Sequence, residues 1–270
     1  PYAVLLENVA GAMAARRQGA TLLSLPTRRL GLTGSSQFDP AAFDRALREH
    51  GAHSVILLPQ MLRAWCAWLG RSGQRADPGL RFVAVGGAAV GAPLLTQAHA
   101  LGIPAYEGYG LSEACSVQTL NLPGANRPGS AGRVLPHGQV RIAPDGEIEL
   151  RGSLHLGYLG DPVPVPDWWP SGDIGRLDAD GYLHIEGRRK NVLITAYGRN
   201  VSPEWVETAL TAQPAVAQAV EMGDGQAQLD AVIWPVPGTT ANLDDAIAQA
   251  VNRANATLPD YARIGRWVLG

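Results

Sequence analysis

The chain has 270 residues, of which 46% are hydrophobic and 17% are charged, so it holds enough apolar material for a sizeable core and too little charge for a disordered chain. Its formal net charge of −2 lacks the basic excess typical of nucleic-acid-binding proteins, so we expect no nucleic-acid partner. Two cysteines, Cys66 and Cys115, are too few for a disulfide framework or a four-cysteine zinc site, and we expect two buried thiols. No apolar run reaches the ~18 residues of a membrane-spanning helix, so we expect no transmembrane segment and a cytoplasmic protein.

The first half of the sequence alternates short apolar segments with helical patterns. Asp39 followed by Pro40 is typical of a helix start and Gly51 of a helix end, which predicts a helix over about 40–50. Further elements are predicted as helices at 3–17, 60–69 and 93–100, and as strands at 55–58, 82–85 and 103–106. Strands separated by helices predict an α/β fold with a mainly parallel sheet.

The composition changes near residue 121, where prolines and glycines become frequent. Short alternating strands at 139–142, 147–151, 175–177 and 182–186 predict a β-barrel-like subdomain over about 121–187. A third pattern follows: a strand at 192–195, a helix opened by Ser202-Pro203, strands at 216–222 and 229–234, and a helix at about 241–256. We therefore predict a large domain over 1–187 and a small α+β domain over 188–270.

Both ends of the sequence are unusual for a complete protein. It opens at Pro1 inside a helical pattern and ends directly after the apolar run 267–269. Because natural termini are usually polar and loose, we expect a fragment of a longer chain.

The segment Tyr106-Glu107-Gly108-Tyr109-Gly110-Leu111-Ser112-Glu113 follows a predicted parallel strand. Ligands of open α/β sheets bind at the carboxyl ends of strands. Glycines permit close backbone approach, Tyr109 offers a flat face to a planar base, and Glu113 offers a hard oxygen ligand suited to Mg²⁺. The alternative interpretation is a turn at the end of a strand with a core tyrosine.

Two further segments carry candidate site residues. Asp173 lies between a glycine turn and a short predicted strand, where a carboxylate either accepts hydrogen bonds from a cis-diol or caps the turn. The basic segment 187–191 lies at the boundary between two patterns, and is either a solvated linker or a hinge that carries an arginine toward a ribose or phosphate.

A serine hydrolase is a competing interpretation of the first segment. Residues 110–114 nearly match the G-x-S-x-G nucleophile elbow around Ser112, with Asp173 and His184 in hydrolase order. Ala114 replaces the final glycine, however, and His184 lies in an alternating strand, so this interpretation is disfavoured.

The order and spacing of the motifs discriminate between these alternatives. After the Gly-Tyr-Gly-x-Ser-Glu segment come Arg-Pro-Gly-Ser-Ala-Gly-Arg (127–133), 146–152, Gly-Tyr-Leu-Gly (157–160), Ser-Gly-Asp (171–173), 180–191, and Asn-Val-Ser-Pro-Glu-Trp-Val-Glu (200–207). This series closely resembles the adenylate-forming ligase superfamily, which includes acyl-CoA synthetases, the adenylation domains of peptide synthetases and firefly luciferase. The resemblance covers nearly the whole chain.

The resemblance implies activation of a carboxylate with ATP to an acyl-adenylate and pyrophosphate, followed by transfer to a thiol such as coenzyme A. It implies that Tyr109 and Gly110 contact adenine, that Ser112 lies beside the phosphate, and that Glu113 holds Mg²⁺. Ser112 and Glu113 are the implied catalytic residues. The resemblance also implies that Asp173 and Arg188 bind ribose. The remaining implied residues are Gly86, Gly87 and Ala88 for the adenine and acyl pocket, and Lys190 and Asn191 for a hinge about which the small domain rotates.

The sequence departs from the family pattern in three places. The Ser/Thr/Gly-rich phosphate loop that ends in lysine is absent, since 32–36 has no lysine, and the C-terminal catalytic lysine is absent. Tyr197 stands where many relatives have glycine in the loop after the hinge, which affects the expected thiol tunnel. We therefore expect this chain alone to adenylate poorly.

The series Gly-Arg-x-Lys-Asn followed by Tyr-Gly-Arg-Asn-Val-Ser-Pro-Glu is most similar to bacterial long-chain acyl-CoA synthetases. Peptide-synthetase domains usually place an aspartate before the glycine pair, and 54–69 contains no acidic residue. This favours a fatty or other apolar carboxylate over an amino acid, with coenzyme A or an acyl carrier protein as acceptor. The second hypothesis is a non-catalytic nucleotide-binding or interaction module of the same fold.

Overall fold

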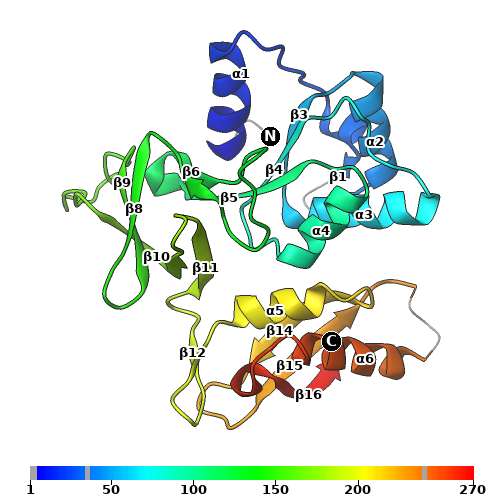
Figure 1. Ribbon diagram of the computed structural model, residues 1–270, viewed down its shortest axis with the longest axis vertical. Helices are drawn as coiled ribbons and strands as arrows, with labels where there is room; N and C mark the ends of the chain where they lie inside the picture. The colour runs from blue at the N-terminus through cyan, green and yellow to red at the C-terminus, as the bar shows by residue number, and fades with distance from the viewer. Residues whose placement is uncertain (1–4, 34–36, 239–241) are drawn as a thin grey trace. The chain divides into compact units, whose positions relative to one another are not determined.

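The computed structural model describes residues 5–33, 37–238 and 242–270, and the chain forms two compact units (Figure 1). The first unit holds the described residues up to Ala143, together with Ile148–Ser171 and Leu177–His184. The second unit holds Pro144–Glu147, Gly172–Arg176 and the described residues from Ile185 to Gly270. Each unit is described by itself below.

A five-stranded sheet with the order β3-β4-β5-β6-β7 forms the centre of the first unit (Figure 1). Its strands are β3 (Ser54–Leu57), β4 (Phe82–Val85), β5 (Ala105–Leu111), β6 (Ser116–Leu120) and β7 (Arg133–Val134). β3, β4 and β5 are parallel, whereas β6 and β7 pair antiparallel. The predicted α/β fold is confirmed, and the parallel part of the sheet is confined to the three strands that helices connect.

Helices α2 (Pro40–Glu49), α3 (Pro59–Ser72) and α4 (Ala92–Ala100) lie where the sequence predicts them. Asp39 caps α2, because its carboxylate accepts hydrogen bonds from the amides of Ala41 and Ala42 at 2.9 and 3.2 Å. The core between helices and strands contains the fully buried Trp65, whose indole N–H donates to Asp44 at 3.0 Å. Other core members include Leu62, Leu69, Val83, Leu95 and Ile103.

The first helix is less regular than predicted. It runs through a π-helical stretch, η1 (Glu7–Met13), into α1 (Ala14–Arg17), and neither stretch contains a buried residue. Residues 3 and 4 of the predicted helix lie outside the described residues. Short elements follow as η2 (Thr27–Leu30), β1 (Leu32–Thr33) and β2 (Gln37–Phe38).

The two cysteines differ in environment. Cys66 is buried in α3, as predicted, and burial raises the pKa of its thiol to about 12. The prediction of a buried thiol is wrong for Cys115, which is exposed and has a left-handed backbone with φ of 51° directly after the turn η3 (Ser112–Ala114). Among the helices of the described residues, none has the length and apolar character needed to cross a membrane.

A four-stranded sheet with the order β11-β10-β9-β8 contributes strands to both units. Its strands are β8 (Gly138–Ile142), β9 (Glu147–Gly152), β10 (Trp169–Leu177) and β11 (Leu183–Arg188). Gly146, with φ of 87°, supplies the left-handed position in the turn between β8 and β9. β10 begins six residues before the predicted strand, so the prediction of a turn at 171–173 is wrong.

The second unit has a three-stranded sheet with β15 (Leu229–Pro235) between β14 (Val216–Met222) and β16 (Ile264–Leu269). Helices α5 (Pro203–Thr211) and α6 (Leu243–Asn255) pack on it around the buried Val206, Leu210, Leu229, Ile233, Ile247 and Ala254. The short strands β12 (Leu193–Ile194) and β13 (Asn200–Val201) pair antiparallel, and η4 (Asp260–Ala262) precedes β16. The predicted α+β order is confirmed, while β16 was not predicted. Residue 241 of the last predicted helix lies outside the described residues.

Candidate functional site

The glycine-tyrosine motif lies inside strand β5 rather than in a turn after it. The prediction that the strand ends at 106 is wrong, because β5 continues through Leu111 and pairs antiparallel with β6. The motif glycines permit this pairing: a Cβ on Gly110 would overlap with the carbonyl oxygen of Ser116, and one on Gly108 would lie 3.0 Å from the carbonyl oxygen of Thr119. Gly108 and Gly110 therefore allow β6 to lie unusually close to β5.

Tyr109 is partly buried and packs against a small core that contains Ala114, Ile148 and Leu150. Ser112 and Glu113 follow in the turn η3, where Ser112 is exposed and Glu113 is partly buried. The structure thus keeps the predicted adenine, phosphate and metal residues within one strand and the turn that follows it.

The segment 155–158 holds Glu113 at two points. The hydroxyl of Tyr158 donates to Glu113 Oε1 at 2.8 Å, and the amide of His155 donates to the Glu113 carbonyl oxygen at 2.7 Å. The Glu113 carboxylate raises the pKa of Tyr158 by accepting this hydrogen bond. Sequence reasoning identified Gly157-Tyr158 as part of a motif and assigned it no role.

The predicted pocket segment Gly86–Ala88 follows β4 and lies against β5. A Cβ on Gly86 would lie 3.1 Å from the carbonyl oxygen of Gly108, so only glycine permits this approach without adjustment. Gly86 is buried, whereas Gly87 and Ala88 are exposed. Two segments separated by some twenty residues in the sequence are therefore adjacent.

Glu107 links the same two segments and was not predicted as a site residue. Its Oε1 accepts a long hydrogen bond of 3.4 Å from the amide of Val90. Burial raises the pKa of Glu107 to about 7, and the Val90 amide opposes this shift. An acidic residue between two motif tyrosines was the signal available in the sequence.

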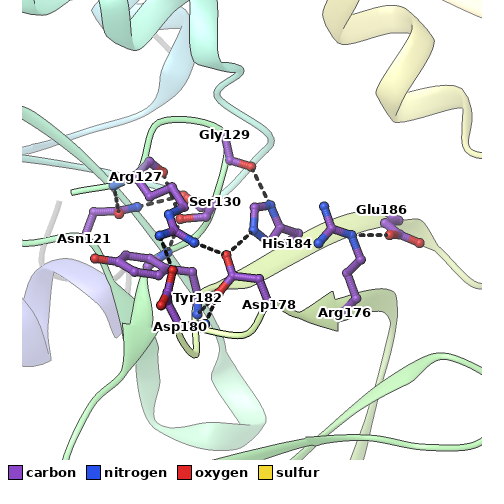
Figure 2. Close-up of polar contacts among 11 residues, drawn as sticks. Asn121, Arg127, Gly129, Ser130, Arg176, Asp178, Asp180, Tyr182, His184 and Glu186 are labelled. Atoms are coloured by element: carbon purple, nitrogen blue, oxygen red, sulfur yellow. Dashed lines mark hydrogen bonds and ion pairs between the residues drawn. The ribbon is translucent and has the colours of Figure 1, made fainter. Parts of the chain in front are cut away.

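Asn121 holds β5 from the other side. Its Nδ2 donates to the carbonyl oxygen of Glu107 at 3.1 Å. Nδ2 also donates to the carbonyl oxygen of Ser130 at 2.7 Å, and Oδ1 accepts from the amide of Arg127 at 2.8 Å (Figure 2). The Asn121 side chain is fully buried. It therefore ties the segment that begins with Arg127 to the backbone of the motif strand.

The Arg127 guanidinium continues this network (Figure 2). It forms ion pairs with Asp178 and, at 2.6 Å, with Asp180, and lies 4.3 Å from the centre of the Tyr182 ring. Asp178 also contacts His184 Nε2 at 3.0 Å, while His184 Nδ1 lies 3.2 Å from the Gly129 carbonyl oxygen.

These contacts weigh against the serine-hydrolase interpretation. Both ring nitrogens of His184 already contact other groups, Gly129 and Asp178. A nucleophile elbow places its serine at a strained turn, but among the described residues of this segment the positive φ angles belong to Cys115 and Ser116 instead of Ser112.

The second unit holds the predicted ribose residues. Asp173 lies in the middle of β10, where its buried carboxylate is 3.0 Å from Nε of Arg188 at the end of β11. Next to it, the Glu147 carboxylate accepts from the amide of Gly172 at 2.8 Å and pairs with Arg189. One acid–arginine pair therefore joins β10 to β11, and the other joins the first residue of β9 to the residue after β11.

Lys190 and Asn191 lie in the exposed turn that follows β11. Asn191 Nδ2 donates to Glu204 Oε1 at 2.5 Å, and the Glu204 carboxylate also accepts from the Ser202 hydroxyl at 2.7 Å. These two contacts connect the turn to the first residues of α5.

The fit of the site to Mg²⁺ depends on Glu113. Within residues 5–33, 37–238 and 242–270, no group of three His, Cys, Asp or Glu side chains is arranged to hold a metal. Mg²⁺ is often bound through one or two carboxylates together with substrate phosphates. Glu113 alone therefore fits an ion that arrives with a nucleotide, and does not fit a permanently held one.

A flat aromatic side chain, a hard carboxylate and a glycine loop on one sheet are the features of a nucleotide site on an α/β fold. The family model described as "AMP-binding enzyme" matches residues 7–157, more than half of the chain, and that of the "AMP-binding enzyme C-terminal domain" matches residues 190–269. This chain belongs to the AMP-binding enzyme family.

Relatives with known names agree with this assignment. The long-chain-fatty-acid–CoA ligase FadD15 of Mycobacterium bovis is 36% identical over 159 residues, which cover 57% of this chain and 26% of that ligase. The indoleacetate–CoA ligase of Aromatoleum aromaticum is 30% identical over 234 residues, which cover 76% of this chain and 44% of that enzyme. The chain therefore spans less than half the length of either relative.

Solved structures show the same fold. The crystal structure of the anthranilate CoA ligase AuaEII, in complex with anthranoyl-AMP, matches with a TM-score of 0.78 at 22% identity, over 93% of this chain and 50% of that one. At this identity the likeness establishes the fold alone.

Proposed function

We propose that this chain is part of an acid–thiol ligase that uses ATP to convert a carboxylic acid into an acyl-adenylate and pyrophosphate, and then transfers the acyl group to coenzyme A. The observation that carries the proposal is the close packing of Gly86 against the β5 strand that holds Tyr109, where a Cβ on Gly86 would lie 3.1 Å from the carbonyl oxygen of Gly108. This packing brings the backbone of the Gly86–Ala88 segment next to the strand of the aromatic motif. The names of the relatives, all CoA ligases, support the same reaction class.

In this proposal the residues of the first unit bind the base and the phosphate. Tyr109 stacks on adenine, with Gly110 and the Gly86–Ala88 segment allowing the close approach, and Ser112 donates its hydroxyl to the α-phosphate. Glu113 holds the Mg²⁺ that accompanies ATP. Mg²⁺ would neutralise phosphate charge when bound, while Ser112 and Glu113 orient the phosphate relative to the carboxylate of the acid.

In the second unit, Asp173 accepts hydrogen bonds from the ribose hydroxyls. Its pairing with Arg188 supports this role, because the guanidinium holds the buried carboxylate in one orientation. We also propose a domain boundary at 187/188 with a hinge at Lys190 and Asn191. The change of family model between residues 157 and 190 is consistent with that boundary.

For the acid substrate we propose a fatty or other apolar carboxylate. The segment 54–69, which forms β3 and most of α3, carries no acidic residue that would hold an amino group. The two relatives are named for a long-chain fatty acid and for indoleacetate, both acids with apolar bodies.

Calorimetric titration with a non-hydrolysable acyl-adenylate analogue tests the proposal. We expect saturable binding by this chain, at least tenfold weaker binding by Asp173→Ala, because one or two charge-assisted hydrogen bonds of roughly 1.5–3 kcal/mol each are lost, and unchanged binding by the control Asp167→Ala. The carboxylate of Asp167 is exposed and pairs with Arg151 at 3.5 Å. Equal affinity of wild type and Asp173→Ala would contradict the ribose assignment, and tighter binding of an aminoacyl analogue would contradict an apolar acid.

Turnover is a separate test. Because neither the lysine-containing phosphate loop nor the C-terminal lysine occurs in these 270 residues, we expect pyrophosphate exchange near background from this chain. Rates like those of complete ligases would contradict this expectation. Analogue binding without turnover in any longer form of the protein would favour the non-catalytic nucleotide-binding module instead.

A further inference from the structure

We propose that Tyr158, supported by the backbone of His155, is a positioning residue that orients the Glu113 carboxylate for its cation. The inference rests on the proposed function, since it concerns the residue assigned above to Mg²⁺. Its basis is the contact of one short segment with both the side chain and the backbone of Glu113.

The two hydrogen bonds fix different parts of Glu113. The His155 amide holds the carbonyl oxygen at 2.7 Å, which sets the backbone of the turn, and the Tyr158 hydroxyl holds Oε1 at 2.8 Å, which sets the side chain. The amide contact is at the short end of N–H···O hydrogen bonds, and the hydroxyl contact has the ordinary O–H···O length. With Oε1 occupied by the hydroxyl, Oε2 is the oxygen we assign to the cation.

The segment 155–158 is itself held by ring contacts. The His155 and Trp169 rings meet edge to face with centroids 4.6 Å apart, and the Tyr158 ring lies 5.0 Å from His155 and 6.2 Å from Trp169. Leu154, one residue earlier, packs against the core that contains Ala114. Both partners of the Tyr158–Glu113 contact are therefore attached to the same part of the first unit.

A tyrosine suits this role better than a cationic side chain. Its hydroxyl is neutral and donates a hydrogen bond without cancelling the negative charge that attracts a cation. An ordinary tyrosine hydroxyl keeps its proton at neutral pH and is therefore available as a donor. Tyr158 is exposed, so the proposal depends on the hydrogen bond and not on burial.

Tyr158→Phe removes the hydroxyl and retains the ring that contacts His155 and Trp169. We expect three- to tenfold weaker binding of Mg²⁺–ATP to the 270-residue chain, with binding of the metal-free acyl-adenylate analogue within twofold of wild type. Tyr261→Phe, at a tyrosine that packs against the core of the second unit, is the matched control and should change neither affinity. Equal losses for both ligands, or no loss for Mg²⁺–ATP, would overturn the proposal.

A double-mutant cycle decides whether Tyr158 acts through Glu113. Tyr158→Phe should weaken Mg²⁺–ATP binding in the wild-type background and should have no further effect in Glu113→Gln. An equal loss in both backgrounds overturns the proposal. Failure of wild type to bind the analogue would instead count against the proposed function, so the two failures are distinguishable.

Discussion

Two regions of the molecule hold acidic side chains in opposite surroundings: Asp178 is partly exposed and has several partners, whereas Glu221 is buried. In the first unit, Asp178 accepts hydrogen bonds from the amides of Asp180 and Tyr182 at 3.0 Å each and contacts both His184 and Arg127. In the second unit, Glu221 of β14 has both carboxylate oxygens buried without a hydrogen bond among the residues that the structure describes. Its nearest acidic neighbours, Glu207 and Glu204 of α5, carry the same charge.

The difference shows that burial and the available partners together determine which form of an acid the fold favours. His184, followed by the backbone amides and Arg127, keeps the pKa of Asp178 well below its ordinary range despite some desolvation. Desolvation, followed by Glu207 and Glu204, raises the pKa of Glu221 to about 8. The two regions should therefore respond to pH with opposite signs.

Glu221→Val is the change with the largest expected effect. Because the folded pKa of about 8 lies above the ordinary 4.5, the folded state retains a proton that the unfolded chain releases, and wild-type stability falls as pH rises from 4.5 to 8. The valine variant should lack this slope and should be more stable at pH 8 by roughly 2–3 kcal/mol, the scale of a buried polar group without a partner. Urea unfolding at several pH values measures the slope, and hydrogen exchange of β14 and β15 peptides assigns it to the second unit.

The control for Glu221→Val is Asp245→Asn, which removes an exposed carboxylate from α6. It should leave the slope unchanged. A valine variant whose stability falls with pH as steeply as that of wild type would show that Glu221 finds a partner in solution, and the contrast between the two regions would be lost.

The elements with a strong local pattern could be predicted from the sequence. Asp39-Pro40 and Ser202-Pro203 specify helix starts by capping and by the fixed φ of proline, and the alternation in 216–222 specifies a half-buried strand. The strand 103–106 was placed too early because glycines were interpreted as turn residues. Gly108 and Gly110 are in fact required for the close approach of β6, which is a tertiary contact without a local signal.

In the candidate site, too, contacts between residues far apart in the sequence could not be predicted. Motif order located Tyr109, Glu113 and Asp173, because these positions are recognised by residue type and spacing. Tyr158 and Asn121 act through hydrogen bonds to residues 45 and 14 positions away in the sequence, so no local pattern could identify them. β16 was missed because it pairs in parallel with β15, 30 or more residues before it.

Glu107→Gln tests a buried acid without a cationic partner in the first unit, where we expect a smaller effect on stability than for Glu221→Val. Burial raises the pKa of Glu107 to about 7, so wild-type stability should fall as pH rises from 4.5 to 7. The effect should be smaller than for Glu221, because the shift is smaller and the Val90 amide opposes it. Glutamine keeps an acceptor for that amide and removes the titration.

The other titratable groups around Glu107 are few. β4, β6 and the segment 86–90 carry none, so the neighbours are Tyr106, Tyr109 and Glu113 nearby in the chain and His99 of α4, whose Nε2 lies 2.7 Å from the Ala105 carbonyl oxygen. Comparing Glu107→Gln with His99→Gln and with the exposed control Glu49→Gln by urea unfolding at pH 5, 6.5 and 8 separates the contributions. If only His99→Gln flattens the profile, Glu107 is not the titrating group.

Asp178→Asn tests an acid that is paired with an arginine and a histidine. Its effect on stability should be the smallest of the three, because solvent and salt screen the partly exposed cluster. The lowered pKa means that Asp178 contributes stability above the ordinary aspartate range and loses it as the pH falls toward the folded pKa. The stability gap between wild type and Asp178→Asn should therefore be widest above about pH 5, narrow progressively as the pH falls below the ordinary aspartate range, and shrink in 0.5 M salt. Asp180→Asn removes the more exposed partner of Arg127 and should give a narrower gap of the same sign. A gap that persists unchanged at acid pH would mean that charge pairing contributes little. The Asp178 side chain would then stabilise the loop through its hydrogen bonds from backbone amides, which an asparagine side chain replaces only in part.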